Sequence, residues 1–222
     1  MDNFLGMIPI PIYCERGNLE GLAEPLNAIS NIAFILASFG IYKLLTKYRI
    51  QKIEYKVVLI LILSIGVGSF LWHATRHSYT LLLDVVPVSL SFAAITYIFL
   101  AKLIGNKLLA LLLALLLIPG RFFISSFAPT DITSSLIRNL INATVFLVII
   151  VWTFKKYGIV ALEGFGILAV YLIAITMRSI DLQICPTFPV GTHFLWHIFN
   201  AFAVYLAVRF LIKLELSQLK QN

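Results

Sequence analysis

Two histidines stand four residues apart in the stretch GTHFLWHIFN, residues 191–200, at the start of the last apolar segment. In a helix, His193 and His197 would project from one face, where two imidazoles can share one metal ion. A related stretch, SFLWH at residues 69–73, ends an earlier apolar segment and supplies His73. Three histidines with an open fourth position form the pattern of a catalytic zinc site. The alternative is a set of core histidines that are satisfied by hydrogen bonds.

The composition is that of an integral membrane protein. Of the 222 residues, 60% are hydrophobic and 12% are charged, and the mean hydropathy is +0.97. Soluble domains carry about twice this charged fraction. The apolar runs are long and continuous, which favours helices over the alternating strands of a membrane barrel. The net charge of +7 comes from basic residues clustered at segment ends, so it indicates membrane orientation, and we identify no nucleic-acid-binding module.

Seven apolar runs predict an all-α bundle of seven transmembrane helices in one domain, residues 27–213. Each run is close to the ~20 residues that a helix needs to cross the hydrocarbon. We place the helices at residues 27–46, 57–75, 81–101, 107–125, 132–154, 158–179 and 193–213. Residues 1–26 precede them as an outer loop without the pattern of a signal peptide, and residues 214–222 follow as a cytoplasmic tail.

The distribution of Lys and Arg predicts the orientation, because cytoplasmic loops are rich in these residues. One side carries the larger set: Lys43, Lys47, Arg49, Lys52, Lys56, Lys102, Lys107, Lys155, Lys156, Arg209, Lys213 and Lys220. The other side carries Arg16, Arg76, Arg121 and Arg178. We therefore expect the N-terminus outside and the C-terminus in the cytoplasm.

This orientation brings the candidate chemistry to one end of the bundle. His73 ends the second predicted helix, which runs outward, and Asp84 begins the third, which runs inward. His193 and His197 begin the seventh helix, which also runs inward. All four residues are expected within about two helical turns of the outer interface. This convergence predicts a single site near the outer surface.

Two further polar residues belong to that level. Ser69 precedes His73 by four residues and so lies one turn deeper on the same helix face. Asp84 stands inside the apolar run LLLDVVPV, where an unpaired charge is costly. An acid near a helix N-terminus that interacts with the helix dipole is the alternative interpretation of Asp84.

The fifth predicted helix opens with a polar stripe that includes Ser134, Ser135, Arg138, Asn139 and Asn142. Such a stripe could line a wet cavity and bind a polar headgroup. It could equally be a seam of hydrogen bonds between helices. In the next helix, the three-residue spacing of Arg178 and Asp181 predicts a structural ion pair.

The outer loops contain acids and the chain's two cysteines. The N-terminal segment offers oxygen ligands for a hard cation such as calcium, although acidic loops are usually only solvated. The candidates are Glu15, Asn18, Glu20 and Glu24, with Asn27 and Asn31 following on the first helix. Cys14 and Cys185 are both expected on the outer side, where a disulfide would persist.

With YCER, AEPLNAISN, GSFLWH, LLLD and GTHFLWH considered together, the chain resembles the alkaline ceramidase family. That family belongs to a wider membrane hydrolase superfamily that includes adiponectin-receptor-like proteins. The resemblance runs nearly from end to end and implies a seven-helix enzyme with zinc held by His73, His193 and His197. It implies that Ser69 stabilises the oxyanion and that Asp84 assists the attacking water.

The same resemblance implies a calcium site and a disulfide. The calcium ligands would be the Tyr13 carbonyl, Glu15, Glu24 and, less securely aligned, Asn18, and the paired cysteines would be Cys14 and Cys185. The family has an Asp just ahead of the Tyr/Trp-Cys-Glu sequence, but this chain reads IPI at residues 10–12. The loop between the two glutamates is also shorter. Calcium is therefore expected to bind more weakly or not at all.

Together with the histidine pattern, the resemblance implies a zinc-dependent amidase that cleaves the N-acyl bond of ceramide or a ceramide-like membrane lipid. Arg138, Asn139 and Asn142 are candidate substrate-binding residues. A receptor or sensor that keeps only the zinc scaffold is the first alternative, and a metal transporter is the second. The Lys- and Ile-rich composition is typical of bacteria, which predicts a multi-pass protein of the inner membrane with its site near the periplasmic side.

Overall fold

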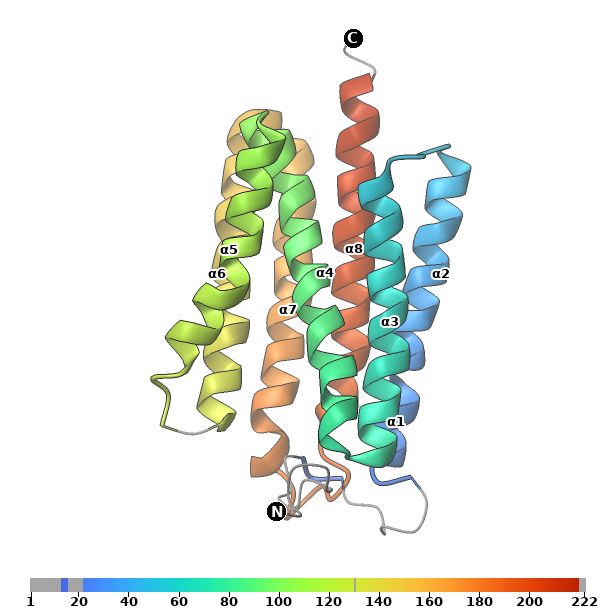
Figure 1. Cartoon of the computed structure of the whole chain (residues 1–222), viewed down its shortest axis with the longest axis vertical. Coiled ribbons are helices and arrows are strands. Elements are labelled where there is room, and N and C mark those ends of the chain that lie inside the picture. The colour runs from blue at the N-terminus through green and yellow to red at the C-terminus, as the bar shows by residue number, and fades with distance from the viewer. Residues whose placement is uncertain (1–12, 16–21, 130, 220–222) are drawn as a thin grey trace.

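The computed structural model describes residues 13–15, 22–129 and 131–219. Within these ranges the chain is helical, and the long helices run side by side along the longest axis of the molecule (Figure 1). The elements are α1 Pro25–Ser30, α2 Ile32–Lys47, α3 Ile53–Thr75, α4 Ser78–Ile104, α5 Lys107–Ser125, α6 Asp131–Tyr157, η1 Gly158–Ala161, α7 Leu162–Ile180, η2 Asp181–Gln183 and α8 His193–Leu219.

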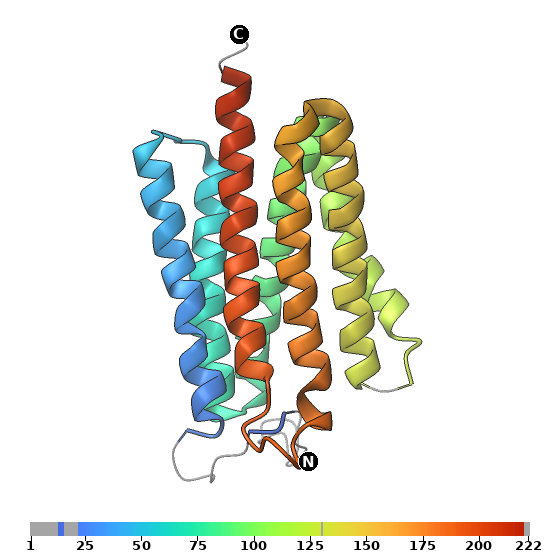
Figure 2. The ribbon, with the colours of Figure 1, turned by 180° about the vertical axis from the view of Figure 1, so that it is seen from behind.

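Six helical stretches in the described residues are long and apolar enough to cross a membrane, so the chain is an integral membrane protein. They begin with Pro25–Lys47, in which α1 and α2 follow one another, and end with His193–Ser217. The stretch Thr133–Gln183 is 51 residues long and contains α6, η1 and α7. Its two long helices lie beside each other in both views (Figures 1 and 2).

The distribution of side chains suits a lipid environment. Large apolar residues such as Leu112, Leu116 and Phe123 on α5 are exposed on the outside of the bundle. Polar residues such as Asn31 and Thr153 are buried within it. Contact with lipid tails carries no free-energy penalty for apolar side chains. The interior of this bundle therefore buries polar groups that need hydrogen-bond partners as well as apolar side chains that pack.

Helix α8 packs against α1, α2, α4 and α7, so it joins the first and last parts of the chain. It continues to Leu219, beyond the end predicted at residue 213. Near its last turns, the buried Glu215 pairs with Lys52 and Lys102. At a rise of 1.5 Å per residue, this ion-pair cluster lies about 33 Å along α8 from His193, at the opposite end of the bundle.

Candidate metal centre

The structure brings His73 from α3 together with His193 and His197 from α8. Each offers one nitrogen, and these three atoms lie within 4.8 Å of one another. All three side chains are almost completely buried. Tetrahedral zinc ligands with bonds of about 2.1 Å lie about 3.4 Å apart, so side-chain shifts on the order of 1 Å would close the group around an ion.

Hydrogen bonds fix the orientation of two of the rings. Nδ1 of His73 lies 2.6 Å from Oε2 of Glu24, and Nδ1 of His197 lies 2.7 Å from Oγ of Ser30. The Ser30 hydroxyl donates its proton to the carbonyl of Asn27 at 2.9 Å, so it accepts from His197. Both Nδ1 atoms therefore carry protons, and each Nε2 keeps its lone pair.

The Nε2 atoms of His73 and His197 are buried and have no hydrogen-bond partner in the described residues. The same is true of both ring nitrogens of His193. Buried imidazole nitrogens are expensive to leave unpaired, because each loses its hydration without a replacement. Convergent unpaired lone pairs are what a metal requires, so the three histidines fit a metal ion.

The imidazole ring of His193 is positioned by aromatic neighbours, because its nitrogens make no hydrogen bond within the described residues. The Tyr13 ring stacks on it with a centroid separation of 3.7 Å, and the Trp196 ring stacks at 5.3 Å. Tyr13 is itself buried, and burial raises the pKa of its phenol. The segment before α1 thus forms part of the wall of the site.

Backbone pairing keeps Glu24 beside His73. The amide N–H of Glu24 donates to the His73 carbonyl at 3.0 Å, and Ala23 pairs in the same way with Ala74. The carboxylate also contacts the Arg76 guanidinium. Burial raises the pKa of Glu24 to about 7, and Arg76 opposes this shift. A carboxylate that orients a ligating histidine is typical of metal sites.

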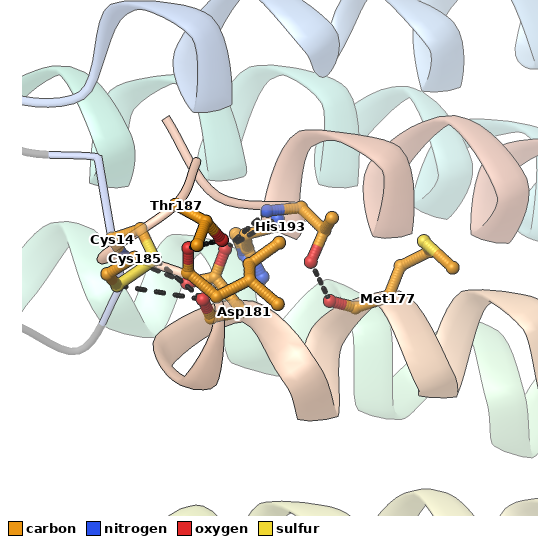
Figure 3. The surroundings of a disulfide bond; sticks show 8 residues. Cys14, Met177, Asp181, Cys185, Thr187 and His193 are labelled. Atoms are coloured by element: carbon orange, nitrogen blue, oxygen red, sulfur yellow. Dashed lines mark hydrogen bonds between the residues drawn. A yellow bond between two sulfur atoms is a disulfide. The ribbon is translucent and has the colours of Figure 1, made fainter. Parts of the chain in front are cut away.

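Asp181 organises the start of α8 (Figure 3). Its Oδ1 accepts hydrogen bonds from the backbone N–H groups of Thr192 at 2.7 Å and His193 at 2.9 Å. Its Oδ2 accepts from the Cys14 N–H at 2.8 Å. The predicted Arg178–Asp181 ion pair is wrong, because this carboxylate is committed to three backbone donors and lies beyond ion-pair distance of Arg178.

The disulfide between Cys14 and Cys185 that the resemblance implied is present (Figure 3). It attaches the segment containing Tyr13 to the connection before α8. Gly191 allows this connection to pass, since its φ is +65° and a β-carbon there would lie 2.1 Å from Oδ1 of Asp181 and 2.6 Å from Cβ of Cys14. The disulfide, Asp181 and Gly191 together place Tyr13 against His193.

Ser69 on α3 and Asp84 on α4 face each other across the helix interface and interact electrostatically. Ser69 is almost completely buried. Ser69 Oγ and Asp84 Oδ1 are buried and have no hydrogen-bond partner among the described residues. Ser69 lies one helical turn from His73, and both polar groups keep unused hydrogen-bonding capacity.

The polar stripe of α6 proves to be both a seam and a cavity wall. Arg121 donates to Oδ1 of Asn142 at 3.3 Å, and Tyr171 donates to Oδ1 of Asn139 at 3.3 Å. Arg138 donates hydrogen bonds to Ser134 and Ser125 and also lines a cavity of about 580 Å³ that reaches Tyr13. The sequence left these two interpretations open, and residues of the stripe take part in both, since Asn139 and Asn142 also line a second cavity.

The candidate calcium ligands are only partly described. Asn18 lies outside the described residues. Both oxygens of Glu15 accept backbone N–H groups at the start of α1, from Leu26 and Asn27 at 2.7 Å each. Glu24 contacts Arg76, Asn27 and His73. Calcium binding stays a prediction, and the ion would compete with these internal partners.

Sequence reasoning missed several residues that build the site. The roles of Ser30, Arg76 and Asp181 were missed, because these residues act through contacts between segments distant in the chain. Glu24 was identified only as a calcium ligand. The AEPLNAISN stretch, with Glu24 and Ser30 six residues apart, was the available signal.

A family model described as Ceramidase matches residues 13–222, nearly the whole chain. A comparison with curated proteins found no match.

Proposed function

Because the chain belongs to the ceramidase family, a family of membrane hydrolases that act on ceramide, we propose that it is a zinc-dependent amidase. Its substrate would be ceramide or a ceramide-like N-acyl lipid. Hydrolysis would release a fatty acid and a sphingoid or other amine.

The observation that carries this proposal is the arrangement of the histidine nitrogens. Two Nδ1 atoms are fixed by Glu24 and Ser30, and the unpaired Nε2 atoms converge with His193. A catalytic zinc ion is typically held by three protein ligands such as imidazoles, and its fourth coordination position stays open for water or substrate. A bound zinc ion would supply Lewis-acid activation of the amide carbonyl and of water.

The chain's own residues would supply proton transfer and charge stabilisation. Asp84 would accept a proton from the attacking water and later deliver it to the leaving nitrogen as the acyl C–N bond breaks. Ser69 would donate a hydrogen bond to the oxygen that becomes negatively charged during attack. Their shared position on facing turns of α3 and α4 supports this division of roles.

A second, narrower cavity inside the bundle offers a place for a short part of the acyl chain. It is about 100 Å³ in volume, and its lining includes Phe34, Ile95 and Phe99 with the polar Asn139 and Asn142. Trp196, which stacks on His193, also lines it. An alkyl chain placed here would bring its carbonyl end toward the histidines.

For topology, we propose that Thr133–Gln183 crosses twice, giving seven spans. A single crossing of 51 helical residues would measure about 77 Å, far more than the roughly 30 Å of hydrocarbon. The lysine-rich end of the bundle would face the cytoplasm, and the histidines would lie near the outer, periplasmic side of a bacterial inner membrane. Accessibility of single cysteines introduced at Lys155 and Gln183 to an impermeant reagent would test this arrangement.

Calcium belongs to the proposal only as a second ion near Tyr13, Glu15 and Glu24. No catalytic step depends on it. Calcium titration of the thermal stability of the purified protein would test its binding.

A receptor with a structural zinc and no turnover is the alternative. The presence of Ser69 and Asp84 beside the histidines favours the enzyme, because a structural zinc needs neither. The deciding experiment is mass spectrometry of lipids after purified protein is incubated with mixed N-acyl lipids, with and without a zinc chelator. Chelator-sensitive release of fatty acid and amine is expected, and zinc-containing protein that releases neither would contradict the enzyme.

A further inference from the structure

A cationic cavity lies next to the histidines. Its volume is about 580 Å³, and it is formed between α3, α4, α5, α6 and α7. Among the described residues that line it, the charged side chains are Arg138 and Arg178. The lining also includes the hydroxyls of Ser134, Ser135 and Ser179. Guanidinium groups beside hydroxyl donors recognise carboxylates, phosphates and sulfonates.

The two arginines are held in place rather than left mobile. Arg178 donates from Nε to Oγ of Ser135 at 2.9 Å, and Arg138 donates to Oγ of Ser134 and, at 3.1 Å, to Oγ of Ser125. The Arg178 guanidinium also stacks over Tyr13 and Trp196, at 5.5 and 5.0 Å from the ring centres. Serine hydroxyls satisfy N–H donors without adding negative charge.

A third arginine strengthens the positive potential. Arg121 is 5% exposed, and its Nε has no hydrogen-bond partner in the described part of the chain. Its guanidinium and that of Arg138 lie 5.2 and 5.3 Å from the centre of the Phe122 ring, which lines the cavity. Positive charges in a low-dielectric wall raise the local concentration of anions.

The cavity is connected to the reaction site through shared walls. Tyr13 lines the cavity and stacks on His193. Trp72 also lines it and precedes His73. Leu81 and Val85 of the lining flank Asp84 on α4. A substrate group that binds in this cavity would therefore be only a few bonds away from the scissile amide of the same molecule.

We propose that the cavity binds an anionic group on the amine side of the lipid, so the preferred substrate is an N-acyl lipid with a carboxylate, phosphate or sulfonate near its amide. This rests on the proposed amidase function and narrows it. Water would add to the acyl carbon, the C–N bond would break, and the leaving nitrogen would take the proton. The products would be a fatty acid and an anionic amine, such as an amino acid.

The test compares substrates that differ only in charge. N-Hexadecanoylglycine and N-hexadecanoylglycinamide share the acyl chain and the amide, and kcat/KM is measured for each with zinc-loaded full-length protein. One charge-assisted hydrogen bond is worth about 1.5–3 kcal/mol, so the acid should be favoured roughly 10- to 100-fold. N-Hexadecanoylsphinganine and its 1-phosphate form a second pair with the same expected direction.

Three variants show whether the arginine causes the preference. Arg138→Gln should bring the ratio of the two kcat/KM values close to 1, whereas Arg138→Lys keeps a cation and should retain most of the preference. Arg209→Gln changes an arginine that pairs with Glu163 far from this cavity and should keep the wild-type ratio. If Arg138→Gln lowers both kcat/KM values but keeps their wild-type ratio, the variant has a general folding defect. That result would overturn the role of Arg138 in the preference for the acid.

A binding arm separates this inference from the proposed function. Chelated protein cannot turn over substrate, so its thermal stabilisation by N-dodecanoylglycine and N-dodecanoylglycinamide reports the cavity alone. Selective binding of the acid that is lost in Arg138→Gln supports the cavity even if no lipid is hydrolysed. Equal binding and equal kcat/KM for acid and amide would overturn it while leaving the amidase intact. Stabilisation by inorganic phosphate equal to that by the lipid acid would assign the cavity to free anions and overturn the lipid substrate.

Discussion

Gly68 lies so close to Leu83 that a β-carbon at position 68 would be 1.9 Å from the Leu83 carbonyl oxygen. That carbonyl cannot make its usual bond four residues along α4, because residue 87 is a proline and has no N–H. The missing side chain at Gly68 thus lets α3 and α4 touch beside Ser69 and Asp84. This contact sets the distance between the two proposed catalytic groups.

The first prediction concerns this helix contact. Gly68→Ala should force α4 away from α3 and lower kcat by 10-fold or more, because small misplacements of catalytic groups cost about 100-fold. Gly166→Ala on α7 is the matched control, since a β-carbon there meets nothing within 4 Å. Zinc content is measured in parallel. Unchanged kcat in Gly68→Ala would show that the spacing of Ser69 and Asp84 does not limit the reaction.

The second prediction concerns Glu24. Glu24→Gln weakens the acceptor for Nδ1 of His73, and loss of such a partner typically costs 10- to 100-fold in metal affinity. Zinc affinity, measured by competition with a chelator at fixed calcium, should fall by this amount. Glu54→Gln on α3 serves as the control. Equal zinc affinity in both variants would mean that Glu24 does not orient His73.

The third prediction concerns the disulfide. Its cysteines are separated by 171 positions, and loop-closure entropy places the upper limit of its stabilisation at about 5 kcal/mol. Cys14→Ser and Cys185→Ser should each lower the midpoint of thermal unfolding in detergent, and the double variant should behave like the single ones. Mass spectrometry without reduction should find the crosslinked peptide. Free alkylation of both thiols in native membranes would contradict it.

Much of the fold could be predicted from the length of the apolar runs alone, since a continuous apolar stretch of about 20 residues in a membrane has few alternatives to a helix. The three histidines were predictable because His193 and His197 stand four residues apart and all three were expected at one membrane level. Ser30 and Asp181 were not, because their roles depend on which distant backbone groups reach them. The Arg178–Asp181 pair failed for the same reason: sequence spacing cannot reveal that three N–H groups of other segments reach the carboxylate first.

The fourth prediction separates metal binding from proton transfer. Ser69→Ala removes a donor to the developing oxyanion, which typically costs about 100- to 1000-fold in turnover. Asp84→Asn keeps the shape but removes the base, so its activity should also be severely reduced, and the acidic limb of the pH–rate profile should be lost. Both variants should retain zinc. Hydrolysis at the wild-type rate in both would exclude the proposed roles and favour the receptor alternative.

The most direct measurement of the central claim is a zinc titration of chelator-treated protein, followed by the rate of N-acyl lipid hydrolysis and by elemental analysis. The rate should rise with added zinc and reach a plateau at about one bound zinc per chain. His197→Ala should neither bind this zinc nor gain activity. Full hydrolysis in metal-free protein, or stoichiometric zinc in the His73→Ala, His193→Ala and His197→Ala variants alike, would contradict a zinc amidase built on these three histidines.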